Sequence, residues 1–564
     1  MRVALSRCLG ISVSRCFGVA GLWRAPCKAA PKPVIRVAMW SRYFGGPGGR
    51  VTLACLRIAV ACSLLGTWWR LVHAMPLSEP ASTNPSLYRA TGLWQLWAPF
   101  VDGPPAPHTV HWLIWGSVAA VTLMLVGFRA RVTTALAVLL MTLLGEHAVS
   151  YAATWPHTYP VVFLTGLALL GAPVGDALSI DEWLARRRGV ALPARAYQWS
   201  ARTATIVVAL MFFSAAMYKL VAGGGTLRWA FSDNLRHHML AQFDLNGLPR
   251  TVVADWLLQD AWRYQAAAFL NLMSQLAPLI AVFIPHRPRL RAAIGGFFVL
   301  ETIALAWVVD LWNWHWLPLY AVFVDWDAVA TWLRTRRGLA AAVALPAVRP
   351  SRWAVGWIVV LLACDAWVSL GYPRVDARWR TYPFTPYPMF ATIRAKPPYG
   401  THQSYEFVAA RYEVVSAAPV RPVTQNWLQR NYFARSLYRN PRAAELRAGV
   451  RSIFEHLQRT EPAAQVTALR LWATTYQVPA YPAPARLVPH DLGILVEVTA
   501  HETRAYVDEA AAAQLSAAGC TLFREGLAVA DTTAAPTGRK KTTWTRVCPR
   551  PSAIGGMAPF VTMR

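Results

Sequence analysis

Long apolar stretches recur along this chain from Val51 onward, and they constrain its fold more than any other feature. A helix that crosses a membrane needs about 20 predominantly apolar residues. About nine stretches reach or approach that length, and we place them at 51–74, 110–128, 132–153, 157–174, 202–221, 264–284, 292–309, 314–330 and 353–371. The pattern predicts a polytopic α-helical membrane domain over residues 51–371.

The composition agrees with this class of protein. Hydrophobic residues make up 55% of the 564 residues and charged residues 15%, and the 27 tryptophans suit membrane interfaces. A net charge of +28 would suggest a nucleic acid partner in a soluble protein. Here many basic residues lie in short loops between apolar stretches, where membrane orientation accounts for them. We therefore expect the lipid bilayer as the partner and no nucleic acid.

Basic residues cluster in the segments that connect alternate apolar stretches. The clusters are Arg129 and Arg131; Arg186, Arg187, Arg188 and Arg195; Arg287, Arg289 and Arg291; and Arg334, Arg336 and Arg337. By the positive-inside rule these segments face the cytoplasm, which makes the N-terminus cytoplasmic. An odd number of spans then places the C-terminus outside. We expect a multi-pass protein of the cell membrane.

Residues 1–50 form a basic N-terminal segment without an acidic residue. Its apolar part is interrupted by Arg7, Arg15 and Arg24, so it lacks a clean signal-peptide core. We expect either a cytoplasmic basic segment or a start codon placed upstream of the true start at Met39.

Residues 372–564 follow the last apolar stretch and have a different pattern, which predicts an extracytoplasmic α/β domain. Residues 405–415 and 493–499 resemble strands, and 425–459 has the pattern of an Arg-rich amphipathic helix. We expect the basic face of that helix to be solvated.

The eight cysteines do not show the paired spacing of a metal site, so no metal is predicted. Cys520 and Cys548 stand alone near the C-terminus. They could form a disulfide if this part of the chain faces an oxidising compartment.

Ionisable residues inside apolar stretches are costly in a membrane and are therefore candidates for function. The fifth stretch has no charge from Thr203 to Met217 and ends at Lys219. A lysine there either extends its ammonium to water along its aliphatic stem, or is desolvated, loses its proton and acts as a general base. The sequence leaves both interpretations open. We expect Arg57, in the first stretch, to extend to the cytoplasmic surface.

Four other ionisable residues are candidates for the site. Glu146 and His147 lie late in the third stretch, where a buried structural pair is the alternative to a functional role. His157 begins the fourth stretch, and it is either an interfacial residue or, if the fourth and fifth stretches are neighbours, level with Lys219. Glu301 lies near the middle of the seventh stretch. Most of these residues fall in the outer half, which suggests a polar cavity open to the outside.

Three short blocks of sequence resemble a known family. They are Trp155-Pro156-His157-Thr158-Tyr159 followed by Ser179-Ile180-Asp181; Phe213 to Leu220 followed by Trp229; and Tyr382 to Phe390. Their order and spacing are similar to those of the horizontally transferred transmembrane (HTTM) family, the membrane domain shared by vitamin K-dependent γ-glutamyl carboxylase and its bacterial relatives. The likeness covers residues 51–391.

The resemblance implies an activity and a place for it. The family's lysine, which deprotonates vitamin K hydroquinone, matches Lys219, and the histidine that supports it matches His157. Reduced vitamin K or menaquinol with O2 and CO2 would be consumed on the outer side of a bacterial inner membrane, and an exported peptide or protein would be carboxylated. Two positions depart from the pattern, because Gln275 stands where Glu is usual before Ala-Pro and Glu301 where His is common. Such changes could alter the reaction.

The sequence supports two hypotheses of function. The first is a quinol-dependent epoxidase or carboxylase with an outward-facing site. The second is a non-catalytic transport, assembly or partner-binding protein on the same scaffold. They differ in Lys219, because a base must lose its proton and cannot be replaced by arginine, whereas an interfacial anchor tolerates arginine.

Overall fold

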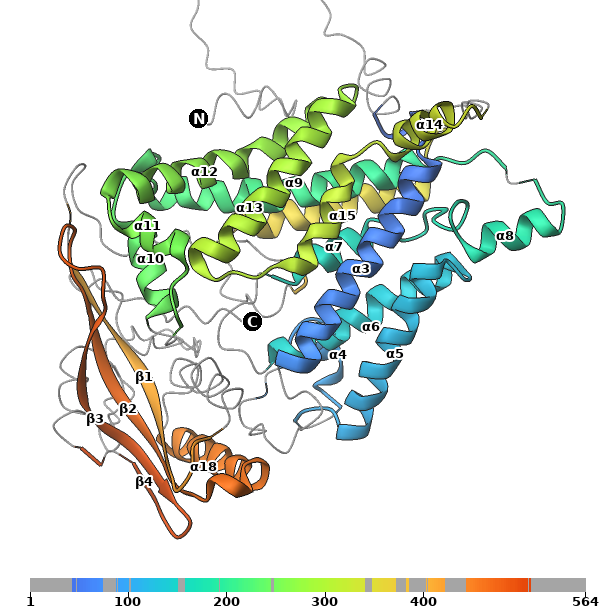
Figure 1. Ribbon diagram of the computed structural model, residues 1–564. Helices are drawn as coiled ribbons and strands as arrows, with labels where there is room; N and C mark the ends of the chain where they lie inside the picture. Colours follow the sequence, from blue (N-terminus) through green and yellow to red (C-terminus); the bar gives the residue numbers. More distant parts are fainter. Residues whose placement is uncertain are drawn as a thin grey trace, which may run out of the picture.

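The computed structural model describes residues 43–46, 48–74, 88, 90–100, 103–150, 158–191, 193–244, 248–339, 347–371, 382–384, 402, 404–420, 443–505 and 507–508. These residues form a helical bundle and a four-stranded antiparallel sheet that carries one helix (Figure 1). The chain is mostly helical, as the apolar stretches predict.

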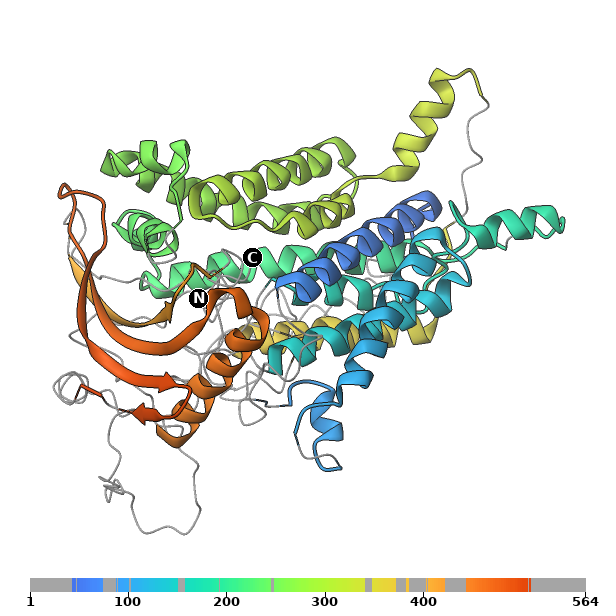
Figure 2. The ribbon, with the colours of Figure 1, turned by 60° about the horizontal axis from the view of Figure 1, so that its bottom comes forward.

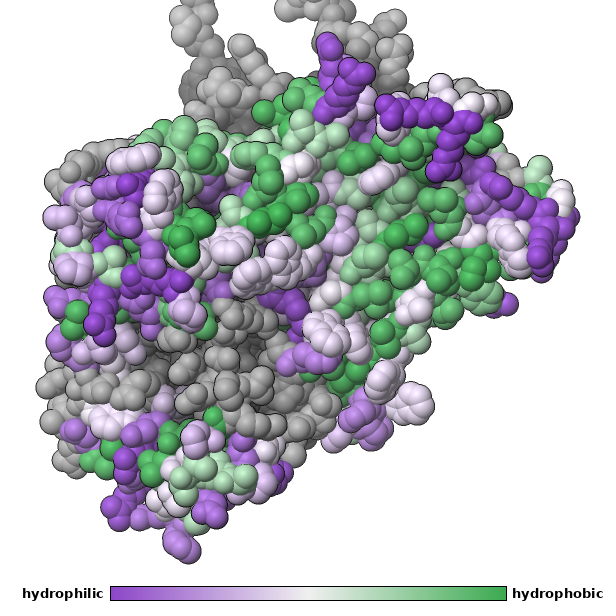
Figure 3. Space-filling model, in the orientation of Figure 1, coloured by the Kyte–Doolittle hydropathy of each residue, from purple (hydrophilic) through white to green (hydrophobic). Residues whose placement is uncertain are grey.

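Seven helices in the described part of the chain are long and apolar enough to cross a membrane. They are α3 (Arg50–Ala74), α5 (Pro107–Val126), α6 (Ala130–Ser150), α9 (Gln198–Ala222), α12 (Ala261–Phe283), α13 (Pro288–Val309) and α15 (Arg352–Gly371). Apolar residues gather over the bundle surface (Figure 3), and large exposed side chains there include Trp112, Leu139, Leu300 and Trp367. Such a surface suits lipid, and the prediction of a polytopic helical membrane domain is confirmed in this form.

Two of the expected spans are not long α-helices. The stretch predicted at 157–174 contains only α7 (Pro160–Leu167), which ends in turns that include Gly171 in the left-handed conformation. The stretch predicted at 314–330 is the 3₁₀ helix η4 (Trp314–Phe323), and Asp325 then caps α14 (Trp326–Arg336). Every helical residue of α7 before Leu167 is buried, as is much of η4. Irregular backbone is tolerated at membrane depth only where protein surrounds it, which explains why these two segments are interior.

The η4 segment nevertheless leads from one end of the bundle to the other. At its start, His315 Nδ1 lies 3.3 Å from Arg70 Nη1, near the end of α3. Beyond its end, Asp327 accepts a hydrogen bond of 2.7 Å from Thr52 Oγ1, near the start of α3. The η4 segment therefore runs antiparallel to α3 along most of its length.

The basic connecting segments lie far from the sheet. Helix α8 (Ile180–Arg187) and α14 both end in arginines, and both lie at the end of the molecule opposite the sheet (Figures 1 and 2). Ser179 caps α8 by accepting from Glu182 N, and Asp181 accepts from Arg129 N and Ala130 N. The side chains of Ser179 and Asp181 thus fix turns at this end.

The sheet has the strand order β1 (Tyr405–Ser416), β2 (Val466–Val478), β3 (Val488–Thr499) and β4 (Thr503–Ala505). Helix α18 (Ala443–Thr460) packs against it. The expected strands at 405–415 and 493–499 are confirmed, as is the expected helix from Ala443 to Arg459, while its part before 443 lies outside the described residues. Strand β2 was not predicted.

The hairpin between β2 and β3 joins the sheet to the bundle. Arg236 of α10 (Asn234–Phe243) donates to the carbonyl oxygens of Pro479 and Ala483, at 2.5 and 2.9 Å. Asp244 Oδ2 accepts from Leu487 N at 2.9 Å. Since α10 follows α9 through η3 (Leu227–Trp229), the sheet lies at the end of the bundle where α9 ends.

Candidate functional site

Lys219 is buried near the end of α9, with only 1% of its surface exposed. Its Nζ donates hydrogen bonds to Asn271 Oδ1 at 2.6 Å and to Gln275 Oε1 at 2.8 Å. It also lies 4.4 Å from the centroid of the Trp229 ring. A lysine that extended to water would leave these groups, so the structure shows Lys219 as buried and not as extended to water.

The two acceptors come from one face of α12. Asn271 and Gln275 are four residues apart, which places them one turn apart on the same side of the helix. Helices α9 and α12 pack along each other, and Lys219 lies in that contact. An amide pair at this spacing can therefore hold one amine from two directions.

The same two amides connect Lys219 to Glu301 of α13. Asn271 Nδ2 donates to Glu301 Oε1 at 2.8 Å, and Gln275 Nε2 lies 3.4 Å from the same oxygen. Both amides thus direct oxygen to the lysine and nitrogen to the carboxylate. Glu301 is 9% exposed, and its Oε2 is buried without a hydrogen bond. We call Lys219, Asn271, Gln275, Glu301 and Trp229 the lysine network.

His157 lies outside the described residues, so the structure does not place the expected partner of Lys219. The next residue, Thr158, is held through its carbonyl, which accepts from Trp316 Nε1 at 2.7 Å and lies 3.1 Å from His315 Nε2. The pairing of His157 with Lys219 stays a prediction.

Glu146 and His147 have other neighbours. Glu146 Oε2 accepts from Leu93 N at 2.9 Å, which ties the segment before α4 (Trp94–Trp97) to α6. His147 lies near the rings of Tyr88 and Trp94, 6.1 and 6.3 Å between centroids. None of these contacts involves the lysine network, and of the three secondary candidates Glu301 belongs to it.

The third family-like block is described only at 382–384. Tyr382 is buried and packs on Phe163 of α7. Burial, and then the nearby Glu146 carboxylate, raise the pKa of Tyr382 well above its ordinary value. Its phenol is therefore a neutral group of the bundle interior.

Asn271 was missed by sequence reasoning. The available signal was a polar pair at i and i+4 within the apolar stretch 264–284. Trp229 and Gln275 were noticed only as parts of the family pattern. The contact between Lys219 and all three residues depends on how α9, α12 and η3 pack.

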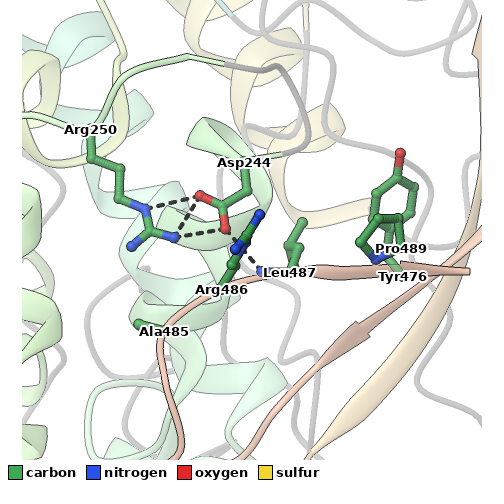
Figure 4. Close-up of a pocket in the computed structure, with 7 residues that line it drawn as sticks. All are labelled: Asp244, Arg250, Tyr476, Ala485, Arg486, Leu487 and Pro489. Carbon is green, nitrogen blue, oxygen red and sulfur yellow. Dashed lines mark hydrogen bonds and ion pairs between the residues drawn. The ribbon is translucent and has the colours of Figure 1, made fainter.

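A cavity of about 650 Å³ lies at the junction between bundle and sheet (Figure 4). Its lining includes Asp244, Arg250, Tyr476 and Arg486. Arg250 Nη2 donates to both Asp244 carboxylate oxygens at 2.7 Å, and the same carboxylate accepts from a backbone N–H of the hairpin. Arg250 and Asp244 neutralise each other, and Arg486 adds one positive charge to the lining. No residue of the lysine network lines the cavity, so the two sites are separate.

Within the described ranges, His, Cys, Asp and Glu do not gather in a group of three or more that could hold a metal ion. Cys520 and Cys548 lie outside those ranges.

Comparison with protein-family models, with curated proteins and with solved structures found no match to this chain. The likeness to the HTTM family therefore rests on its three sequence blocks.

Proposed function

We propose that this integral membrane protein is an HTTM-type enzyme that oxygenates a quinol, with Lys219 as the base. The observation that carries the proposal is a lysine that is almost fully buried at the end of a membrane-length helix and held by side chains of two neighbouring elements. Burying a cation is costly, and a lysine kept inside a membrane domain is a candidate for function.

The hydrogen bonds suit a neutral amine. Two N–H groups of Nζ can serve Asn271 and Gln275, which leaves the nitrogen lone pair free to accept a proton. Arginine cannot take this role because its guanidinium stays protonated. The amide pair therefore orients Lys219 for proton removal from a hydroxyl.

The lysine network also offers polar contacts to an aromatic diol. Glu301 Oε2 is a buried oxygen without a hydrogen bond, and a hydroxyl of the quinol would give it a partner. The Trp229 ring offers an apolar face beside Nζ. Reduced vitamin K or menaquinol, when bound, supplies the reaction with O2 that in this family drives carboxylation by CO2.

The position of the basic helices supports an outward-facing site. Helices α8 and α14 lie opposite the sheet, and the positive-inside rule assigns such arginine-rich segments to the cytoplasm. The end of α9 and the sheet would then face outward in the cell membrane, where an exported peptide or protein could be the acceptor of CO2.

The test is oxygen-dependent conversion of menaquinol or reduced vitamin K to its epoxide by the protein purified in detergent. We expect turnover by the wild type and loss of at least about 100-fold in Lys219→Ala and Lys219→Arg, the scale of a general base. Val221→Ala is the control, because that side chain lies two residues away on α9 and is 66% exposed.

Full activity in Lys219→Arg would reject Lys219 as the base. A folded wild type that turns over no quinol would leave the non-catalytic transport, assembly or partner-binding role on this scaffold.

A further inference from the structure

Lys219 and Glu301 are a buried basic and a buried acidic residue, and their side chains do not contact each other directly. Asn271 accepts from Lys219 at 2.6 Å and donates to Glu301 at 2.8 Å, so it separates the two groups by one amide. Gln275 repeats the arrangement with a second amide, at 2.8 and 3.4 Å. The amide dipoles therefore run from the carboxylate to the amine on both paths.

Charge balance limits the states that this pair can adopt. Burying one uncompensated charge in a low-dielectric interior is far more costly than burying none or a matched pair. Two states are neutral overall: ammonium with carboxylate, and amine with carboxylic acid. They contain the same number of protons and differ only in which residue holds the proton.

We propose that Lys219 and Glu301 share one proton, so that Glu301 is the positioning residue that takes the proton from Lys219 and makes it a base. In this exchange the N–H bond of Lys219 breaks, an O–H bond forms on Glu301, and one positive and one negative charge disappear together. Glu301 Oε2, which is buried and has no hydrogen bond, is the atom that would take that proton.

The first test of this proposal rests on the proposed function of Lys219 as a base. The protons of that step balance as follows. The amine takes a proton from a substrate hydroxyl, the O–H bond breaks, and the electron pair stays on the oxygen. The new ammonium is compensated by that oxyanion, while Glu301 stays neutral. Each stage therefore has no net buried charge.

Other groups beside the pair are few. Among the described residues, Lys219 and Glu301 are each other's charged neighbours. On the side of α12, the residues next to the pair are Asn271, Ser274 and Gln275, whose side chains do not titrate. From η4, Tyr320 lies near Glu301 and exchanges a hydrogen bond of 2.7 Å with Thr302. Within the part of the chain that the structure describes, the pH response of the site should therefore depend mainly on the pair.

The first test is the pH–rate profile of menaquinol epoxidation in the wild type, Glu301→Gln and Glu301→Asp. Glutamine mimics the carboxylic acid, because it can accept from the amides and carries no charge. In the proposed working form Glu301 is already neutral, so we expect Glu301→Gln and Glu301→Asp to keep the acid limb of the wild type. A Glu301 that stays ionised beside Lys219 would instead raise the acid limb of the wild type, and Glu301→Gln would then move the limb to lower pH by about one unit or more, the usual effect of a close opposite charge. Such a move overturns the proposal.

The second test does not use catalysis. In Lys219→Met, Glu301 is left alone in the interior and must hold the proton itself to stay neutral. The thermal unfolding midpoint of this variant should then fall as the pH is raised from about 6 to about 9, since ionising a buried carboxylic acid favours the unfolded state. The double variant with Glu301→Gln should lose this dependence.

The two tests separate the proposals. A pH-dependent midpoint in Lys219→Met without quinol turnover by the wild type supports Lys219 as the charge partner of Glu301 and rejects the quinol reaction. If turnover depends on Lys219 but the unfolding midpoint of Lys219→Met changes with pH as the wild type does, only the shared proton is rejected.

Discussion

The two amides of the lysine network should contribute unequally to stability. Asn271→Leu removes two hydrogen bonds of good length, 2.6 Å to Lys219 and 2.8 Å to Glu301. Leaving a buried polar group without its partner costs about 1–3 kcal/mol, so this variant should lose about 2–6 kcal/mol. Gln275→Met removes one good bond of 2.8 Å and one contact of 3.4 Å, longer than an ordinary hydrogen bond. It should lose about 1–3 kcal/mol.

The measurement is the unfolding free energy of both variants in the same detergent, determined by chemical or thermal denaturation. Leu270→Ala is the control, because this neighbour on α12 is 61% exposed and lies outside the network. Epoxidation is measured on the same preparations, and we expect Asn271→Leu to be the slower enzyme because Lys219 loses its shorter hydrogen bond. Equal losses, or a larger loss for Gln275→Met, would refute the assignment of the network from these distances.

Two further predictions concern the junction and the family pattern. Arg236→Ala removes the hydrogen bonds to the carbonyls of Pro479 and Ala483, so we expect a loss of about 2–6 kcal/mol and faster proteolysis of the β2–β3 hairpin. Arg486→Ala, at an exposed position of the same hairpin, is the control, and equal cleavage of the two variants contradicts the prediction. Gln275→Glu should place two carboxylates in contact, and adding Glu301→His should relieve this. The unfolding free energies of the four proteins in this cycle should therefore be non-additive by about 1–3 kcal/mol, and additive values argue against the contact.

The sequence predicted the long helices well because apolar length is a direct requirement of the bilayer. The stretch predicted at 202–221 is helix α9, and that at 353–371 is α15. Hydropathy could not reveal that 157–174 and 314–330 are short and irregular, because residues surrounded by protein and residues surrounded by lipid are equally apolar. Pro318 inside η4 was the available signal for the second.

The site was predicted in part. Lys219 is evident as a cation at the end of an uncharged stretch, and Glu301 as an acid within one. Their connection was not predictable, because it depends on the rotation of α9, α12 and α13 about their axes, which tertiary packing decides. The structure brings Gln275 and Glu301, the two positions that depart from the family pattern, to 3.4 Å from each other. In this contact the carboxylate comes from α13 and the neutral partner from α12.

Arg57 shows why the type of partner matters more than burial. This arginine was expected to reach the cytoplasmic surface, but it is fully buried and donates to the carbonyl oxygens of Val174 and Leu178 at 2.7 and 2.5 Å. Backbone carbonyls cannot exchange protons, so Arg57 has one stable state and fixes the turn after α7. Lys219 is equally buried, yet its amide partners lead to Glu301, a group that can hold a proton. Arg57 is thereby a structural anchor, whereas Lys219 belongs to a pair for which we propose two states without net charge.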